Sequence, residues 1–499
     1  MRVNHFKSHT IRIAIYAFIF FISGFILAVV YKTTHPSPVN CPRCNVVIIS
    51  IDPLRADNLP CFKYIYNTTP NLCRYANRNT LFTNAYAHSS WTLPSIMSMI
   101  TSQYPYEHGM LVPYQSVLSP STVTLPQALK SAGYHTIFVG DTNNSHLPLD
   151  KGLGRGFEVI SEDPHEPKAL NELIIQQNNS RKPFFMFIHN FDMSASWSRA
   201  ASPPASFRFD TAFAPPKLYD PKVFIPTAWK DAIYYLEQKV ELSENYSRIL
   251  SLLKKSTSAQ QAYTYFNQLS PTDQQTILSF SIFEYINMTN PTHIRLLRNL
   301  YDERLFLLDK SLASPLELLS SPPWDDNTIV IIVANHGDEL GEHGRMSHGT
   351  NLFGSTTHIP LILHTPNTPP ARINALVGSI DIFPTILEII GVPKPKSIRG
   401  ESLVPLVNKT MPRLLRDYVI SQLGPFPWIS SIRTPSWSYY KDDTDLPPEA
   451  LFNLNTDPNE QSNIASQHGD VTKQLQKTLL QESHMNPAVQ SLKSQTTHP

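Results

Sequence analysis

The chain has 499 residues, with 41 Lys and Arg against 40 Asp and Glu and a formal net charge of +1. This length accommodates one large domain and a smaller one, each with its own apolar core. The balanced charge provides no basic field, so we expect no nucleic-acid partner. The 43 prolines against 17 glycines indicate rigid connections between elements rather than a glycine-rich phosphate loop.

An uncharged apolar segment near the N-terminus predicts a membrane anchor. Residues 13–31 read IAIYAFIFFISGFILAVVY, which is long enough as a helix to cross a hydrocarbon core of about 30 Å. Arg2, Lys7 and Arg12 precede it, so residues 1–12 should stay in the cytoplasm while everything after the segment is exported. We find no convincing small-residue cleavage site, which favours an uncleaved signal anchor. The predicted location is single-pass, with the bulk of the chain periplasmic, extracellular or lumenal.

All 4 cysteines lie close to this predicted anchor, in or soon after a linker at residues 32–44. They are Cys41, Cys44, Cys61 and Cys73. Cys41-Pro-Arg-Cys44 has the spacing of half a zinc knuckle, but no second pair follows at zinc spacing. In an exported chain, one or two disulfides are the favoured interpretation.

Apolar runs separated by helical patterns predict an α/β domain around a largely parallel sheet. A continuous β-branched run such as NVVIISI at residues 45–51 is typical of a strand buried on both faces. Similar runs occupy residues 136–139, 184–188 and 328–333. Parallel strands this far apart need crossover helices, and Asn290-Pro291 predicts the start of one that runs towards Leu319.

The pattern divides the rest of the chain into four parts. The large α/β domain is expected over residues 45–410, with a polar helical insertion at 215–289. Short strands and turns predict a small C-terminal α+β subdomain over residues 411–482. Residues 483–499 are polar and are expected to form a flexible tail.

Polar side chains follow two of the predicted strands. Asp52 comes directly after the first strand, and Asn335 and His336 follow the strand at residues 328–333. Open α/β sheets bind ligands at the carboxyl ends of their strands. Together with a hydroxyl at the start of a helix, these oxygen and imidazole groups indicate a divalent cation site.

Several motifs resemble the sulfatase family of the alkaline-phosphatase superfamily, over nearly all of the chain from Asn45 to about Ala465. The motifs include NVVIISIDPLRAD at residues 45–57, SWTLPSIMSMIT at 90–101, NHGDELGEHG at 335–344 and LFNLNTDPNEQSN at 451–463. The resemblance implies a three-layer αβα sandwich with a largely parallel central sheet. It also implies an ester hydrolase with one divalent metal ion, for which Ca²⁺, Mn²⁺ and Zn²⁺ are not distinguished.

The resemblance assigns roles to individual positions. Asp52, Asn335 and His336 fall on metal-ligand positions, and Thr92 falls on the nucleophile position, which also touches the metal. His348, twelve positions after His336, matches the cationic residue that grips the substrate's anionic oxygens or protonates the leaving group. Arg55 is a further candidate for substrate binding, and its alternative role is a structural salt bridge.

Four departures from the family pattern bear on the chemistry. Sulfatases of this family use formylglycine, made from cysteine or serine, whereas threonine cannot be oxidised to that aldehyde. The family's arginine two residues after the proline is Ile96 here, and Asn335 replaces an aspartate. In the stretch FIHNFDM, where His189 is retained and is expected to be a hydrogen-bonded core residue, Asp192 is followed by Met193 instead of the usual Pro-His.

These residues predict a membrane-anchored, metal-dependent hydrolase of sulfate or phosphate esters with a threonine nucleophile. Its substrate would be an anionic ester on a glycan, a lipid head group or a small molecule. One alternative is a phosphoethanolamine- or phosphoglycerol-type transferase of the cell envelope, because relatives of that kind use a metal-bound threonine. The other is a catalytically degenerate binding protein with the sulfatase fold.

Overall fold

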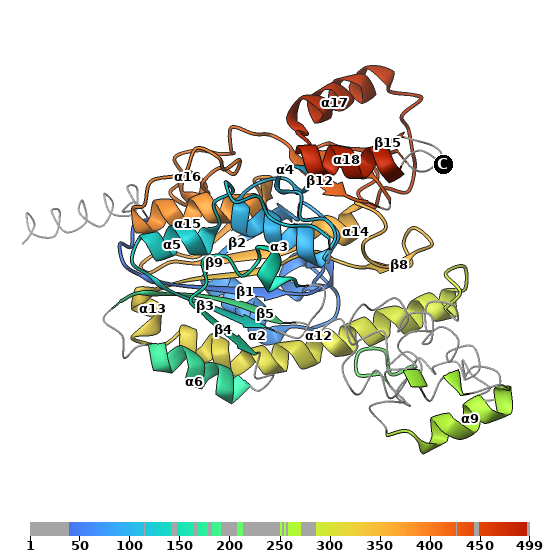
Figure 1. Cartoon of the computed structure of the whole chain (residues 1–499), viewed down its shortest axis with the longest axis horizontal. Helices are drawn as coiled ribbons and strands as arrows, with labels where there is room; N and C mark the ends of the chain where they lie inside the picture. Colours follow the sequence, from blue (N-terminus) through green and yellow to red (C-terminus); the bar gives the residue numbers. More distant parts are fainter. Residues whose placement is uncertain are drawn as a thin grey trace, which may run out of the picture.

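The computed structural model describes most of the chain after the predicted anchor (Figure 1). The described residues are 39–113, 115–140, 147–162, 167–177, 182–190, 207–212, 250–251, 254–255, 258–270, 286–425, 427–443 and 449–496. The apolar segment at 13–31 and most of the insertion at 215–289 lie outside them. Among the helices in these ranges, none combines the length and apolarity that crossing a membrane requires.

A nine-stranded sheet forms the centre of the large domain, with strand order β10-β2-β9-β6-β1-β5-β3-β4 and β11 paired to β2. All its pairings are parallel except those of β9 with β2 and β6, so the sheet is mixed but mostly parallel, as predicted. The strands are β1 (Asn45–Ile51), β2 (Thr80–Tyr86), β3 (His135–Gly140), β4 (Val159–Glu162), β5 (Phe184–Asn190), β6 (Thr328–Ala334), β9 (His358–His364), β10 (Ala371–Ile373) and β11 (Val377–Gly378).

Helices cover both faces of this sheet, which gives the three layers implied by the family resemblance (Figure 1). One face carries α2 (Pro70–Arg78), α6 (Pro167–Gln177) and α12 (Pro291–Leu319), and the other carries α3 (Thr92–Thr101), α5 (Leu125–Ser131) and α15 (Ile382–Ile390). The predicted start of α12 is confirmed: Asn290 caps the helix by accepting the Thr292 N–H at 2.9 Å, and Pro291 is its first residue.

The large domain contains further, mostly short elements. They are η1 (Ala56–Asn58), η2 (Pro60–Phe62), α4 (Pro105–His108), η3 (Leu149–Lys151), α9 (Ala259–Gln268), α13 (Trp324–Asn327), β7 (Glu339–Leu340), β8 (Met346–Ser347), α14 (Gly354–Thr357), η5 (Ser379–Asp381) and α16 (Val404–Val407).

Disulfides Cys41–Cys44 and Cys61–Cys73 pair all four cysteines, which confirms the disulfide interpretation over a zinc knuckle.

The C-terminal part forms the predicted small α+β unit. Its antiparallel sheet has the order β12 (Val419–Leu423), β13 (Ile429–Arg433), β14 (Trp437–Asp442) and β15 (Glu449–Asn453), followed by α17 (Gly469–Glu482). Residues 483–499 were expected to form a flexible tail, but helix α18 (Pro487–Thr496) occupies most of this segment. It forms because Asn486 caps it at the Val489 N–H, and because Val489 packs against Trp428.

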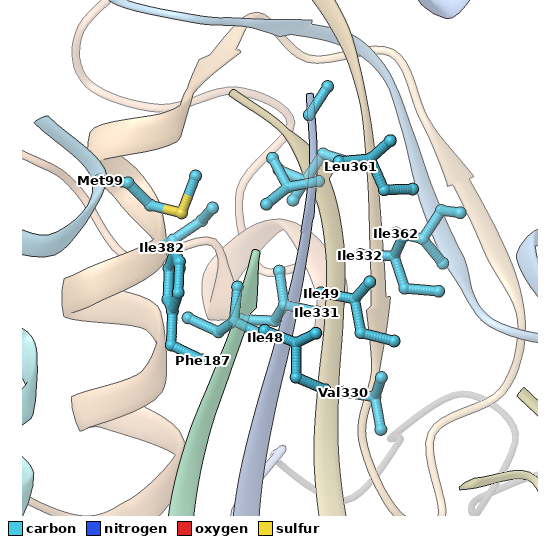
Figure 2. Close-up of a cluster of buried hydrophobic side chains, with 14 of the residues drawn as sticks. Ile48, Ile49, Met99, Phe187, Val330, Ile331, Ile332, Leu361, Ile362 and Ile382 are labelled. Carbon is cyan, nitrogen blue, oxygen red and sulfur yellow. The ribbon is translucent and has the colours of Figure 1, made fainter. Parts of the chain in front are cut away.

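The core of the large domain fills both sides of the central strands, against α3 and α15 on one face and against α2, α6 and α12 on the other. Figure 2 shows Ile48 of β1, Phe187 of β5 and Ile331 of β6 packed near Met99 and Ile382 of the covering helices. Every residue of β1 and of β6 is buried. The continuous apolar runs read from the sequence therefore correspond to strands covered on both faces.

Truncating the centre of β1 tests this packing. Ile48→Ala should lower the free energy of unfolding by about 2–5 kcal/mol, because it leaves a cavity where Ile48 is fully buried. Val159→Ala, on edge strand β4 where Val159 is 40% exposed, should change it by less than about 0.5 kcal/mol. Urea denaturation of both variants gives the comparison, and equal losses would contradict the assigned core.

Candidate active site

Strands β1 and β6 bring Asp52 and the Asn335-His336 pair together. The two strands run parallel with Ile51 opposite Ala334, so the residues that follow each strand emerge at the same level. The Leu54 N–H donates to the His336 carbonyl at 2.9 Å and the Asn335 N–H donates to the Ile51 carbonyl at 3.2 Å. These bonds tie the two strand ends to each other.

Helix α3 delivers Thr92 to the same point. Thr92 is the first residue of this ten-residue helix, and Ser95 in its first turn donates to the Asn335 carbonyl. The Thr92 hydroxyl donates to Asp52 Oδ2 at 3.0 Å and lies 3.3 Å from His336 Nε2. The N-terminus of a helix carries partial positive charge, so an anion beside Thr92 would be stabilised.

His336 is neutral and presents a bare nitrogen to this cluster. Its Nδ1 lies 2.9 Å from the Gly337 carbonyl, which can only accept, so the ring proton resides there. Burial, reinforced by the charge of His348, lowers the pKa of His336 to about 3. Its unprotonated Nε2 therefore faces Asp52 Oδ1 at 3.3 Å.

The Asp52 carboxylate is ionised despite being buried. Burial alone would raise the pKa of Asp52, but the surrounding histidines, His336 first, hold it well below its usual range. His189, expected to be a hydrogen-bonded core residue, contributes as well, because its Nε2 lies 3.5 Å from Asp52 Oδ2 while its Nδ1 lies 3.3 Å from Ser50 Oγ. Met193 lies outside the described residues.

The oxygen and nitrogen atoms that meet here are of the kinds that bind a single cation, although they are few. An ionised carboxylate and a bare imidazole nitrogen converge with the Thr92 oxygen, and His336 donates its other ring N–H to a carbonyl, as metal-binding histidines do. Asn335 is less well placed: its Oδ1 accepts the His336 N–H at 2.8 Å, and its buried Nδ2 has no hydrogen-bond partner in the described structure. Across the described residues, no three His, Cys, Asp or Glu side chains form a metal-holding group.

His348 lies on the other side of His336. The two ring centroids are 4.3 Å apart, and His348 Nδ1 lies 3.0 Å from Asp338 Oδ1. Burial alone would lower the pKa of His348, but the Asp338 carboxylate raises it above its ordinary value. The pairing with Asp338 thus favours the protonated, cationic form of His348. Gly349, at φ +76°, allows close contact with Trp91, because a Cβ there would overlap the indole ring.

Asp338 is a site residue that the sequence analysis did not single out. It is fully buried, its Oδ1 pairs with His348, and its Oδ2 has no hydrogen-bond partner in the described part of the chain. It fixes the orientation of the imidazole and stabilises its protonated form. Its signal in the sequence was its position two residues after His336, within the same motif.

Arg55 and Ile96 lie outside the cluster of polar groups. The Arg55 guanidinium is buried and bonds Asp57 through two nitrogens, Glu342 at 2.9 Å and the Asp338 carbonyl at 2.9 Å. This arrangement matches its structural alternative, a salt bridge behind the site. Ile96 is fully buried in the apolar core beneath α3, so it contributes no charge to the site.

The fold, with this cluster at the carboxyl edge of its sheet, defines an alkaline-phosphatase-like α/β protein. The chain belongs to the sulfatase family, whose model, described as Sulfatase, matches residues 44–392. A second model, described as N-sulphoglucosamine sulphohydrolase, C-terminal, matches residues 341–485.

Similar proteins extend over most of the chain. Arylsulfatase K of Danio rerio is 24% identical over 421 residues, covering 80% of this chain and 76% of its own length. N-acetylgalactosamine-6-O-sulfatase of Bacteroides thetaiotaomicron is 22% identical and covers 88% of this chain and 93% of its own.

Solved structures share the fold at low identity. A protein in complex with its substrate D-glucosamine-2-N,6-O-disulfate superimposes with a TM-score of 0.63 at 20% identity, covering 91% of this chain and 98% of its own. A phosphonate monoester hydrolase from Silicibacter pomeroyi gives 0.61 at 21%, covering 88% and 94%.

The pairing of His348 with Asp338 predicts a pH dependence. Because the pKa of His348 is raised, its ring should be fully protonated at pH values below the ordinary histidine pKa. The imidazolium should be lost only as the pH rises through the raised pKa of His348. Asp338→Asn should move this titration to lower pH. Histidine ring resonances followed by NMR across a pH series measure both proteins, and an unchanged titration would contradict the assigned pairing.

Proposed function

We propose that this protein is a membrane-anchored hydrolase of sulfate or phosphate esters in which the Thr92 hydroxyl is the nucleophile. The observation that carries the proposal is the hydrogen bond of 3.0 Å from Thr92 Oγ1 to the ionised Asp52, at the N-terminus of α3. A hydroxyl is a weak nucleophile unless a neighbouring base receives its proton. Asp52 is placed to receive it. Because the lowered pKa of Asp52 makes this carboxylate a weak base, the transfer would also need the cation proposed below, which would lower the pKa of the hydroxyl.

In the first step, Thr92 Oγ bonds to the sulfur or phosphorus of the ester while its proton passes to Asp52 Oδ2. The bond from the central atom to the leaving oxygen breaks, and the imidazolium of His348 gives that oxygen its proton. The product is an alcohol, and the anionic group stays on Thr92. The positive end of α3 and the charge on His348 stabilise the negative oxygens of the transferred group.

In the second step, water attacks the same central atom and gives a proton to His348, which the first step left neutral. The Thr92 oxygen leaves and recovers its proton from Asp52. The free sulfate or phosphate is released and all residues return to their starting states. This direct route needs no formylglycine, which threonine cannot form.

A divalent cation is part of the proposal. Asp52, Thr92 and His336 would hold it, and Asn335 would contribute its oxygen only after turning away from the His336 N–H. When bound, the cation would lower the pKa of the threonine hydroxyl and offset charge on the transferred group. Ca²⁺ usually takes six to eight oxygen ligands, so this mixed nitrogen and oxygen set favours Mn²⁺ or Zn²⁺.

Family membership and the names of the similar proteins favour a sulfate ester over a phosphate ester. Arylsulfatase K and N-acetylgalactosamine-6-O-sulfatase are both named for sulfate esters. The threonine supports phosphate, because phospho-threonine intermediates occur in relatives of the transferase type. The fold itself also houses a phosphonate monoester hydrolase.

The point where the chain enters the domain favours hydrolysis over transfer to a lipid of the same bilayer. The Val39 N–H bonds Asn408, and the Cys41 N–H bonds the Ile389 carbonyl, just before β1 begins at Asn45. Asp52 lies at the opposite end of β1, roughly 20 Å away for a strand of this length. With an anchor at residues 13–31, the site would thus face away from the point of attachment.

Nucleophile variants test the proposal. In the full chain supplied with Mn²⁺, Ca²⁺ or Zn²⁺, Thr92→Ala should reduce release of sulfate or phosphate from aryl esters by on the order of 10³-fold or more. Thr92→Ser, which keeps the hydroxyl, should retain most of the activity. Matched aryl sulfate, phosphate monoester and phosphate diester substrates identify the transferred group. No turnover of any ester by the folded protein would favour the degenerate binding protein, which the buried Ile96 also suits.

Metal removal provides a separate test. Chelation should abolish turnover, and readdition of Mn²⁺ or Zn²⁺ should restore it. Asp52→Asn should weaken metal retention, measured by elemental analysis of the purified protein, because it removes the one carboxylate among the proposed ligands. Unchanged turnover after complete chelation would show that Asp52 and His348 act without a cation.

A further inference from the structure

A basic cleft lies at the edge of the central sheet, beside β10 and β11. Its volume is about 770 Å³, within the size range of ligand sites. Its walls are the edge segment 371–376, the segment 409–417 that follows α16, and the turn at Pro435 in the C-terminal unit. None of the proposed catalytic residues or metal ligands lines it, so it is separate from the candidate active site.

Positive charge is concentrated in this cleft. The chain as a whole has a formal net charge of +1, whereas the lining holds a single carboxylate, that of Asp417, and four basic side chains. The basic residues are Arg372, Lys409, Arg413 and Arg416. Among the described residues, no carboxylate forms an ion pair with Arg372 or Lys409, and Arg413 and Asp417 form an exposed pair at 4.0 Å. Such a pair stabilises little, so the cleft as a whole favours an anionic ligand.

Arg416 is the buried member of this set. Its side chain is 7% exposed, and its Nη2 pairs with Asp381 at 2.6 Å. Its Nε and Nη1 have no hydrogen-bond partner in the part of the chain that the structure describes. Buried N–H groups are normally bonded, because an unpaired one costs free energy. Two unpaired donors on a buried cation therefore favour an anionic acceptor at this end of the cleft.

Much of the remaining lining is apolar. It includes Ile373, Leu376, Leu406, Met411, Pro412 and Pro435. Leu415, in the segment 409–417, is 80% exposed. A free phosphate or sulfate ion would gain nothing from such a surface. A phospholipid carries its phosphate next to a glycerol and acyl chains, so it matches both the basic and the apolar parts.

The cleft lies where the chain enters the domain. The Val39 N–H donates to Asn408 Oδ1 at 3.1 Å, and the next residue, Lys409, lines the cleft. Residues 32–38, between the proposed anchor at 13–31 and Val39, can span at most about 25 Å. With the anchor in a bilayer, this end of the cleft therefore stays within reach of the lipid head groups. The linker does not complement the cleft itself, because its sequence KTTHPSP contains no acidic residue.

We propose that this cleft binds the phosphate group of an anionic phospholipid in the bilayer that holds the anchor. The inference goes beyond the proposed hydrolase activity and rests only on the anchor that is part of the proposed function. Lys409 and Arg413 attract the head group, while Leu415 contacts the lipid surface. This second attachment orients the domain on the membrane, which a single anchor followed by a linker does not.

Lipid charge tests the proposal on the full chain inserted in nanodiscs. The four native cysteines are paired in disulfides, so a cysteine introduced by Leu415→Cys can be labelled selectively with a polarity-sensitive fluorophore. The emission should shift to the blue in nanodiscs containing phosphatidylglycerol, relative to nanodiscs of phosphatidylcholine alone, because the label contacts lipid. High salt should reduce this shift because it screens the charges. Identical emission in both lipids would overturn the proposal.

Charge reversal locates the effect in the cleft. In the labelled protein, Lys409→Glu together with Arg413→Glu should abolish the blue shift, and both residues are exposed, so the fold should tolerate the change. Lys473→Glu together with Lys477→Glu changes the net charge equally at exposed positions of α17 outside the cleft, and should leave the shift unchanged. The proposal would be wrong if both double variants behaved alike.

Other outcomes separate the cleft from the anchor, from the activity and from soluble anions. A full chain that does not remain in nanodiscs would remove the anchor, and flotation with phosphatidylglycerol vesicles would then test the cleft alone: loss of flotation on charge reversal at the cleft supports it, and no flotation overturns it. No readout involves ester turnover, so an inactive protein would remove only the hydrolase function. Binding of heparin or inorganic phosphate at the cleft, with no response to phosphatidylglycerol, would overturn the assignment to lipid.

Discussion

The parallel register between β1 and β6 is the constraint on which the candidate site depends. It places Ile51 opposite Ala334, so Asp52 and the Asn335-His336 pair leave the sheet at one level. Both strands are buried along their whole length, and backbone bonds just past their ends, from the Leu54 N–H to the His336 carbonyl and from the Asn335 N–H to the Ile51 carbonyl, hold the register. A slip of one residue would move Asp52 by about 3.3 Å and turn its side chain to the other face. The hydrophobic core thus sets the distances between groups that are themselves polar.

The C-terminal unit supports the segment that carries His348. His343 lies 3.0 Å from the Asn459 carbonyl through Nε2, and its ring stacks on Phe353 at 3.9 Å. Glu460, paired with Arg433 at 2.6 Å, also accepts the backbone N–H at the start of α14. These contacts therefore attach the loop between β6 and α14 to the C-terminal unit at two points. The second family model includes this loop from residue 341 onwards together with the C-terminal unit in one match, which agrees with their packing as a unit.

The sequence predicted those features that local pattern determines. Continuous apolar runs predicted the central strands, and Asp52 and His336 were noted for their positions at strand ends, whereas Thr92 was assigned from the family resemblance. The role of Asp338 could not be predicted in this way, because it depends on a contact with His348 across a loop. Helix α18 was missed because its residues are polar and its start is fixed by Asn486, which bonds the Tyr106 carbonyl far away in the chain. Tertiary contacts of this kind leave no periodic signal.

The two unusual charge substitutions at the site offset each other. Relative to the family pattern, Asn335 removes one negative charge from the cation position, and Ile96 removes one positive charge from the first turns of α3. The described residues of the cluster then offer two carboxylates, Asp52 and the Asp338 that pairs with His348, against the raised-pKa imidazolium of His348. Adding a divalent cation gives a net charge near +1, which would attract an anionic ester. Loss of only the negative charge or only the positive charge would have left an uncompensated charge at a buried site. The paired change therefore favours an active site with altered chemistry over one that has lost its activity. Direct attack by a threonine fits such a site.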